Sequence, residues 1–168
     1  MAIEQITAHG VLIVTSVTNM ATLVGSMLRS LGRRDIREAT SATEAMTELR
    51  RRIFEVIIID EGLETADAVE FVRKLRACVD CQNRYTPVIM MSAAPDAARI
   101  AAARDAGVTE FLRKPFAASH LQARLDSIEK NPRPFIESPT FVGPDRRRRR
   151  AELDKPERRK AAAQSNSV

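Results

Sequence analysis

Three side chains suited to phosphoryl-transfer chemistry follow short apolar runs in this sequence. Asp60 and Ser92 each come directly after such a run, and Lys114 lies two positions after a third. A carboxylate can attack phosphorus, while a hydroxyl and an ammonium group can hold the oxygens of the transferred group. The carboxyl ends of parallel strands form the reactive edge of an α/β sheet. We therefore treat these three residues as one candidate site.

A second segment with chemical potential is rich in arginine. Five consecutive arginines occupy positions 146–150, and the pattern proline, acid, arginine, arginine occurs twice, twelve positions apart, as Pro144-Asp145-Arg146-Arg147 and Pro156-Glu157-Arg158-Arg159. A guanidinium group stacks on a base, forks onto guanine O6 and N7, and pairs with phosphate. A neighbouring carboxylate can accept hydrogen bonds from the donor edge of guanine. Two such units suit a two-fold symmetric guanine dinucleotide.

The positive charge of the chain is concentrated in this segment. Residues 132–168 hold 10 of the 27 Lys and Arg and 5 of the 22 Asp and Glu, which leaves 17 of each sign upstream. A block of like charge behaves as an interaction arm more often than as part of a core. Prolines and Gly143 also interrupt residues 132–144. We therefore predict one domain at residues 1–131 and a largely disordered, Pro/Arg-rich extension at residues 132–168.

The elements that must position the candidate site alternate regularly. Apolar, β-branched runs predict strands at residues 11–14, 54–59 and 87–91, and weaker signals predict strands at residues 35–38 and 109–112. Helical spacing of apolar residues separates them, Ser41 and Glu44 form a capping-box signal, and Gly32 and Gly107 close helices. This order predicts the α/β fold class, with a five-stranded parallel sheet between two layers of helices.

The ordered set of Asp60, Ser92, Phe111, Lys114 and the following Pro115-Phe116 resembles the receiver domain of response regulators, of the CheY-like, flavodoxin-like (βα)5 type. The resemblance covers residues 10 to 130. It implies that Asp60 is the phosphoacceptor, Ser92 and Phe111 the hydroxyl and aromatic switch residues, and Lys114 the phosphate-pairing lysine. It also implies a signalling module rather than an enzyme, with a histidine kinase among the candidate partners.

The sequence departs from the family where a metal ion would bind. The family places two acidic residues just after the first strand, whereas this chain has Thr15 and Ser16 there. Magnesium requires hard oxygen ligands and several negative charges, so we do not expect Mg²⁺ at this degenerate site. Either Glu61 or Glu64 would be the substitute ligand if phosphorylation occurs. The alternative is an inert Asp60 paired with Lys114.

The arginine-rich extension makes the chain similar to the Cle subclass of CheY-like proteins, which bind cyclic di-GMP and act on the flagellar motor switch. This resemblance implies that cyclic di-GMP replaces phosphate as the input signal. The expected ligand-binding residues are Asp145, Arg146, Arg147, Arg148, Arg149, Arg150, Glu157, Arg158 and Arg159. Two alternatives remain: a single-domain response regulator phosphorylated on Asp60, and a module whose basic tail binds nucleic acid nonspecifically.

The remaining features limit the class of protein. The chain has no span apolar enough for a membrane helix and no secretory signal at its start, so we expect a cytoplasmic protein. Cys78 and Cys81 resemble half of a zinc or redox site, but no second pair exists, and we interpret them as free thiols.

Overall fold

The computed structural model describes residues 9–147. Five parallel strands form one sheet: β1 (Val11–Val14), β2 (Ile36–Ala39), β3 (Val56–Asp60), β4 (Val88–Ser92) and β5 (Glu110–Arg113). Their order across the sheet is β2-β1-β3-β4-β5. The predicted fold class is therefore confirmed, with each strand within one or two residues of its predicted position. Every residue of β1, β3 and β4 is buried, as their continuous apolar character requires.

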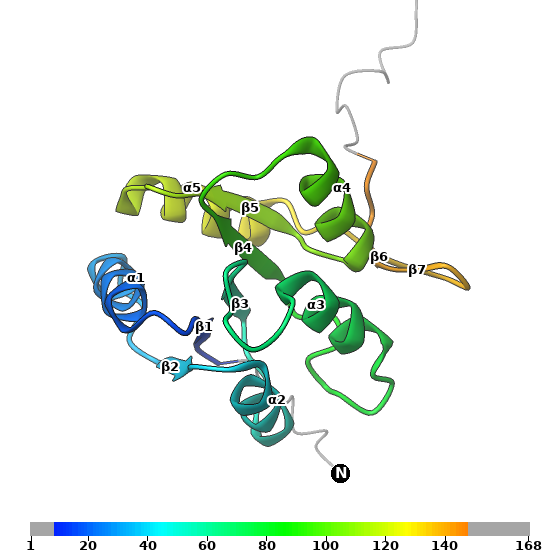
Figure 1. The fold of residues 1–168 in the computed structure, drawn as a ribbon, viewed down its shortest axis with the longest axis horizontal. Coiled ribbons are helices and arrows are strands. Elements are labelled where there is room, and N and C mark those ends of the chain that lie inside the picture. The colour runs from blue at the N-terminus through cyan, green and yellow to red at the C-terminus, as the bar shows by residue number, and fades with distance from the viewer. Residues whose placement is uncertain (1–8, 148–168) are drawn as a thin grey trace, which may run out of the picture.

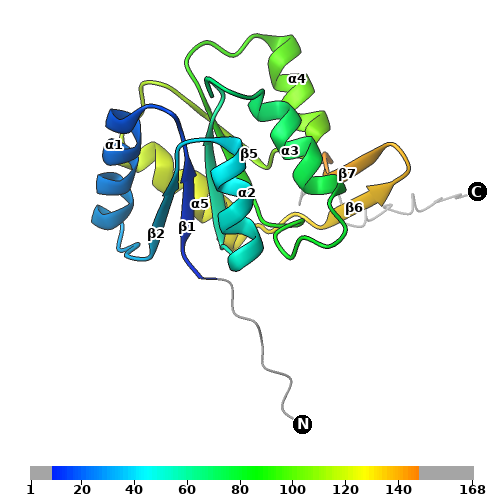
Figure 2. The same ribbon diagram turned by 60° about the horizontal axis from the view of Figure 1, so that its bottom comes forward.

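Five helices cover the two faces of this sheet (Figures 1 and 2). They are α1 (Thr18–Ser30), α2 (Ala42–Arg51), α3 (Ala68–Ala77), α4 (Ala97–Ala106) and α5 (Ala118–Lys130). Side chains of α1 and α5 pack on one face, and side chains of α2, α3 and α4 pack on the other. No helix in the described range is both long and apolar enough to cross a membrane.

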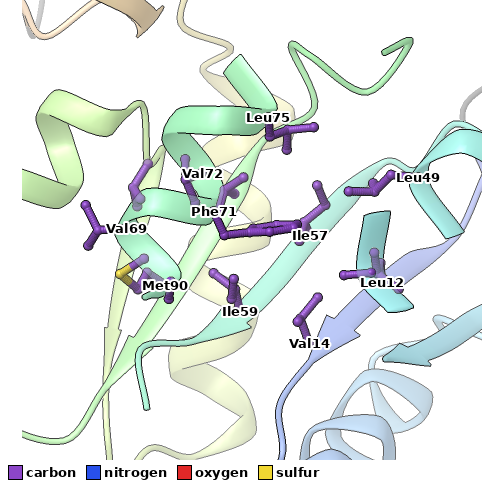
Figure 3. Packing of buried hydrophobic residues seen from close by; sticks show 14 of the residues in the cluster. Leu12, Val14, Leu49, Ile57, Ile59, Val69, Phe71, Val72, Leu75 and Met90 are labelled. Carbon is purple, nitrogen blue, oxygen red and sulfur yellow. The ribbon is translucent and has the colours of Figure 1, made fainter. Parts of the chain in front are cut away.

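The two hydrophobic cores follow from the alternation of side chains along each strand. In β1 and β3, Leu12 and Ile57 point toward α2 and α3, whereas Ile13 and Ile58 point toward α1 and α5. Figure 3 shows the first of these cores, in which Phe71 and its neighbours from α3 lie over β3. The strands are thus held between helices, and their carboxyl ends meet at one edge.

Local signals in the sequence correctly mark several element ends. The Ser41 hydroxyl accepts from the Glu44 amide at 3.2 Å, and the Glu44 carboxylate returns to the amide of Thr40 rather than to that of Ser41. Gly32 and Gly107 have positive φ values of 85° and 106°. At Gly107 a side chain is excluded for a further reason, since its Cβ would lie 2.9 Å from the Val142 carbonyl oxygen.

The expectation that residues 132–144 lack regular structure is wrong. Strands β6 (Phe135–Ser138) and β7 (Phe141–Pro144) form an antiparallel hairpin, which lies beside the ends of α3 and α4 (Figure 2). Prolines are compatible with it because they sit before the first strand, in the turn and at the outer end of the second. The domain boundary after Asn131 stays a prediction, and residues 148–168 lie outside the described range.

A buried arginine connects the hairpin to the receiver-like body. Arg76 of α3 is 1% exposed, and its guanidinium donates to the carbonyl oxygens of Gly107, Arg84 and Thr86 at 2.7 to 3.2 Å. It also lies under the hairpin, 4.8 Å from the centre of the Phe135 ring. Burial lowers the pKa of Arg76 to about 9, which leaves it charged at neutral pH.

Candidate functional site

Asp60 ends β3 at the carboxyl edge of the sheet, where it is 2% exposed. One carboxylate oxygen accepts from the Lys114 ammonium at 2.8 Å and from the Gly62 amide at 3.1 Å. The other accepts from the Thr15 hydroxyl at 3.1 Å. The structure thus brings together three residues that lie far apart in the sequence, and it compensates the buried charge with an ammonium group and two neutral donors.

Thr15 and Ser16 follow β1 at the same edge of the sheet, and both side chains are uncharged. The Thr15 hydroxyl donates to Asp60 and accepts from the Val17 amide at 3.2 Å, so its single donor is used. The Ser16 hydroxyl oxygen is buried and has no hydrogen-bond partner within residues 9–147. An unsatisfied buried hydroxyl is unusual in a folded protein, and this one lies where the family has a metal-binding acid.

The Ser92 hydroxyl is directed to Glu61 instead of Asp60. It donates to the Glu61 carboxylate, which also accepts from the Arg99 guanidinium at 2.7 Å. Arg99 pairs in turn with Asp67 at 3.4 Å, and the hydrogen bonds that Arg99 donates to Glu61 and Asp67 raise the pKa of Arg99. These contacts run from the end of β4 to the start of α4. The Ser92 hydroxyl is therefore held by Glu61 and not by Asp60, the predicted phosphoacceptor.

The site does not fit a magnesium ion. The Asp60 carboxylate oxygens already accept hydrogen bonds from Lys114, Gly62 and Thr15. Glu61 is engaged by Ser92 and Arg99, and Glu64 is exposed. Within the described part of the chain, no three His, Cys, Asp or Glu side chains gather as metal ligands. Magnesium prefers several anionic oxygens, which this donor set lacks.

The Asp67 side chain caps α3 and gives a pH-dependent contribution to stability. Its carboxylate accepts from the Val69 amide at 2.8 Å and from Arg99. Partial burial raises the pKa of Asp67, but these hydrogen bonds outweigh it and lower the pKa below the usual 3.8. The cap is therefore fully effective above the unfolded-state pKa and is lost as the pH falls through the folded-state pKa.

We expect Asp67→Ala to reduce the free energy of unfolding at pH 7 by about 1 kcal/mol, as for other N-caps. Urea denaturation at a series of pH values measures this difference, which should shrink below about pH 4 as the wild-type carboxylate is protonated. Asp80→Ala, in the loop after α3, is the matched control and should leave stability within about 0.5 kcal/mol. A difference that stays constant down to pH 2 would contradict this account.

The remaining residues predicted for the phosphoacceptor site lie in and after β5. Lys114 follows β5 and reaches Asp60, and its amide donates to the Ser92 carbonyl oxygen at 2.8 Å. Phe111 is half-buried in β5, where it packs against the core and lines a cavity on the α4 side. The predicted roles of Asp60, Ser92, Phe111 and Lys114 in phosphorylation stay predictions.

Three of the residues predicted to bind a ligand lie within the described range. The Asp145 carboxylate accepts from the Arg147 amide at 2.9 Å. Arg146 pairs with Asp105 at 2.9 Å and lies 4.0 Å from the centre of the Phe141 ring. Arg148, Arg149, Arg150, Glu157, Arg158 and Arg159 lie outside that range.

The two predicted sites lie at opposite ends of the sheet. Asp60 is at the carboxyl end of β3, whereas Arg146 pairs with Asp105, shortly before the start of β5. Sequence reasoning missed the connection of Glu61 with Arg99, because Arg99 is 38 positions away and lies in a helix with an otherwise unremarkable pattern. It also missed Arg104 and Arg133, which join Arg146 around one cavity.

Comparison with known proteins agrees with the fold. The family model of the response regulator receiver domain matches residues 11–126. The chemotaxis protein CheY-3 of Vibrio cholerae is 30% identical over 118 residues, which cover 70% of this chain and 89% of CheY-3. The KDP operon transcriptional regulatory protein KdpE of Escherichia coli is 40% identical over 88 residues, 52% of this chain and 37% of KdpE.

Solved structures show the same architecture. The receiver domain of the sensor histidine kinase PA1611 from Pseudomonas aeruginosa, with magnesium in its active-site cleft, has a TM-score of 0.62 at 27% identity and covers 71% of this chain and 96% of its own. Vibrio cholerae CheY4 has a TM-score of 0.66 at 24% identity, covering 73% and 99%. From the matched family model, the sheet order and the positions of Asp60 and Lys114, this chain belongs to the response regulator receiver domain family.

Proposed function

We propose that this chain is a non-enzymatic signalling adaptor of the response-regulator type, which binds cyclic di-GMP through its arginine-rich segment. The bound form then engages a signalling partner such as the flagellar motor switch. The observation that carries this proposal is the position of the first Pro-Asp-Arg-Arg copy. Arg146 is fixed on α4 through Asp105 and lies over Phe141, so this copy is attached to the receiver instead of extending from it.

The state of the phosphoacceptor site supports an input other than phosphate. Thr15 and Ser16 occupy the two positions after β1 where the family has acidic residues. The Ser92 hydroxyl donates to Glu61 and not to Asp60. A dianionic phosphoryl group at Asp60 would lack the metal charge that normally neutralises it. A ligand that binds at the arginine-rich segment bypasses this requirement.

The chemistry of the arginine-rich segment favours a guanine dinucleotide. An arginine that is already held against an aromatic ring loses less conformational freedom when a base stacks on it or a phosphate pairs with it. Asp145 supplies a carboxylate within two residues of that arginine. The proposed motility role is further supported by the chemotaxis relative CheY-3.

Phosphorylation of Asp60 is the second candidate function. It is favoured by the Asp60–Lys114 ion pair of 2.8 Å, which places an ammonium group close enough to pair with an oxygen of a phosphoryl group on Asp60. Under this alternative, a histidine kinase is the upstream partner, as is common for receiver domains. Incorporation of phosphate from acetyl phosphate with magnesium would support it.

Calorimetric titration of cyclic di-GMP into the full chain, at two salt concentrations, tests the proposed function. We expect saturable binding with a dissociation constant of about 1 µM or lower. The double variant Arg147→Ala/Arg159→Ala, which removes one arginine from each copy, should weaken binding by roughly 30-fold or more. Arg34→Ala removes one exposed charge elsewhere and should leave the affinity unchanged.

The outcomes separate the candidate functions. No heat of binding with the wild-type chain would refute the proposed ligand. Equal affinity for single-stranded oligonucleotides of any base, falling steeply with salt, would instead identify a nonspecific nucleic-acid binder. A chain truncated after Asn131 would be an unsuitable control for this titration, because the truncation also removes a hairpin that packs on α3 and α4.

A further inference from the structure

We infer that the receiver body itself contributes an anion-binding pocket, which takes a phosphodiester group of the ligand held by the arginine-rich segment. The pocket lies between α4, the start of β5 and the base of the hairpin, and has a volume of about 330 Å³. Three arginines line it: Arg104 from α4, Arg133 from the segment before β6, and Arg146 from the segment after β7. For the identity of the ligand, this inference rests on the proposed function.

The hairpin is what brings two of these arginines together. The Asp145 amide donates to the Pro134 carbonyl oxygen at 2.8 Å, which closes the base of the hairpin. Arg133 and Arg146, which flank this bond, are therefore neighbours in space although thirteen positions separate them. Gly143 packs against Gly107 so closely that a Cβ would lie 2.9 Å from the Gly107 Cα atom. This contact seats the hairpin base directly beside α4 and β5.

The charges around the pocket leave an excess of cations. Glu110 itself lines the pocket, where it accepts from Arg133 at 3.4 Å and lies 3.9 Å from Arg124, and Asp105 pairs with Arg146 at 2.9 Å. Arg104 makes no ion pair within residues 9–147. Glu110 is 7% exposed and also accepts from the Ser127 hydroxyl, so its charge serves to orient Arg133.

The arrangement of three arginines around the pocket suits a phosphate group of a ligand better than a single carboxylate group of a ligand. Three guanidinium groups from three segments can surround an anion with several donors, and each charge-assisted bond is stronger than a neutral one. A volume of this size admits a phosphodiester with part of its sugar. The adjacent Arg147 and Asp145 extend the same surface toward the rest of the Pro-Asp-Arg-Arg copy.

Arg104→Gln is the most direct test, because this change leaves no described carboxylate without its partner. We expect it to weaken binding of cyclic di-GMP to the full chain about 5- to 10-fold in calorimetry. The matched variant Arg34→Gln should bind as the wild type does. If the wild type binds and both variants match it, the pocket inference is wrong while the proposed function stands.

Failure of the wild type to bind cyclic di-GMP would refute the proposed function. In that case a second measurement tests whether the pocket binds an anion. Inorganic pyrophosphate is titrated into the labelled full chain, and the amide resonances of Val108, Thr109 and Glu110 are followed by NMR. Saturable shifts at these amides that are lost in Arg104→Gln would support the pocket. No saturable shift, or the same shift in Arg104→Gln, would overturn it.

Discussion

The double variant Thr15→Asp/Ser16→Asp is expected to bind Mg²⁺ roughly 100-fold more tightly than the wild type, because it supplies the two carboxylates that the site lacks. Without metal, the new carboxylates would lie beside the buried Asp60, whose charge is matched, within the described part of the chain, by Lys114 alone. We therefore expect the metal-free variant to be less stable by about 2 kcal/mol at neutral pH, and Mg²⁺ to restore this loss. Calorimetry and thermal denaturation measure both effects.

The conservative variant Thr15→Ser/Ser16→Thr is the matched control, since it keeps two neutral hydroxyls. It should bind Mg²⁺ no better than the wild type. Mass spectrometry after treatment with acetyl phosphate extends the test, with incorporation expected only in the acidic variant. Strong Mg²⁺ binding by the wild type would contradict the conclusion that its site does not fit the ion. It would instead favour Glu61 or Glu64 as a metal ligand.

We also expect Arg76→Met to lower the free energy of unfolding by about 3 kcal/mol or more. Methionine approximates the aliphatic stem of arginine, but it cannot donate to the carbonyl oxygens of Gly107, Arg84 and Thr86. These buried acceptors would lose their partner, and the hairpin would lose the cation under Phe135. Urea denaturation measures the loss.

Amide exchange separates local from global effects of this change. The amide of Val142, in the hairpin strand next to Gly107, should exchange much faster in Arg76→Met than its change in global stability alone allows. Arg73→Met is the control on the same helix, because Arg73 is exposed and, among residues 9–147, forms an ion pair with Glu70 alone. It should alter stability by about 0.5 kcal/mol or less. Equal effects of the two substitutions would show that Arg76 does not anchor the hairpin.

The opposite locations of the two sites bear on how such an adaptor would respond to a ligand. The Asp60 edge is closed by internal hydrogen bonds, whereas the arginine-lined pocket borders α4 and β5. A ligand in that pocket would contact α4 directly, beside the start of β5. It would thus act on the receiver body without phosphorylation of Asp60.

The amino-acid sequence by itself determined the sheet, the helices and the chemical type of the Asp60 site. Continuous apolar runs, helical spacing and residues such as Ser41 and Gly107 act locally, so their effect can be seen in a short window. The order of Asp60, Ser92 and Lys114 along the chain placed them at strand ends, and parallel strands bring those ends together. Thr15 and Ser16 directly follow a predicted strand, so the sequence also showed that neutral residues replace the two acidic residues of the family there.

Only the tertiary structure decided which partner each polar group has. Ser92 donates to Glu61, 31 positions away, and Arg76 reaches Gly107, also 31 positions away; neither pairing has a local signature. The hairpin at residues 135–144 was hidden because its proline content argues against a strand, although an edge hairpin tolerates proline at its ends. Closing that hairpin places Phe141 under Arg146 and gathers three arginines around one pocket, because spatial proximity depends on packing and not on sequence separation.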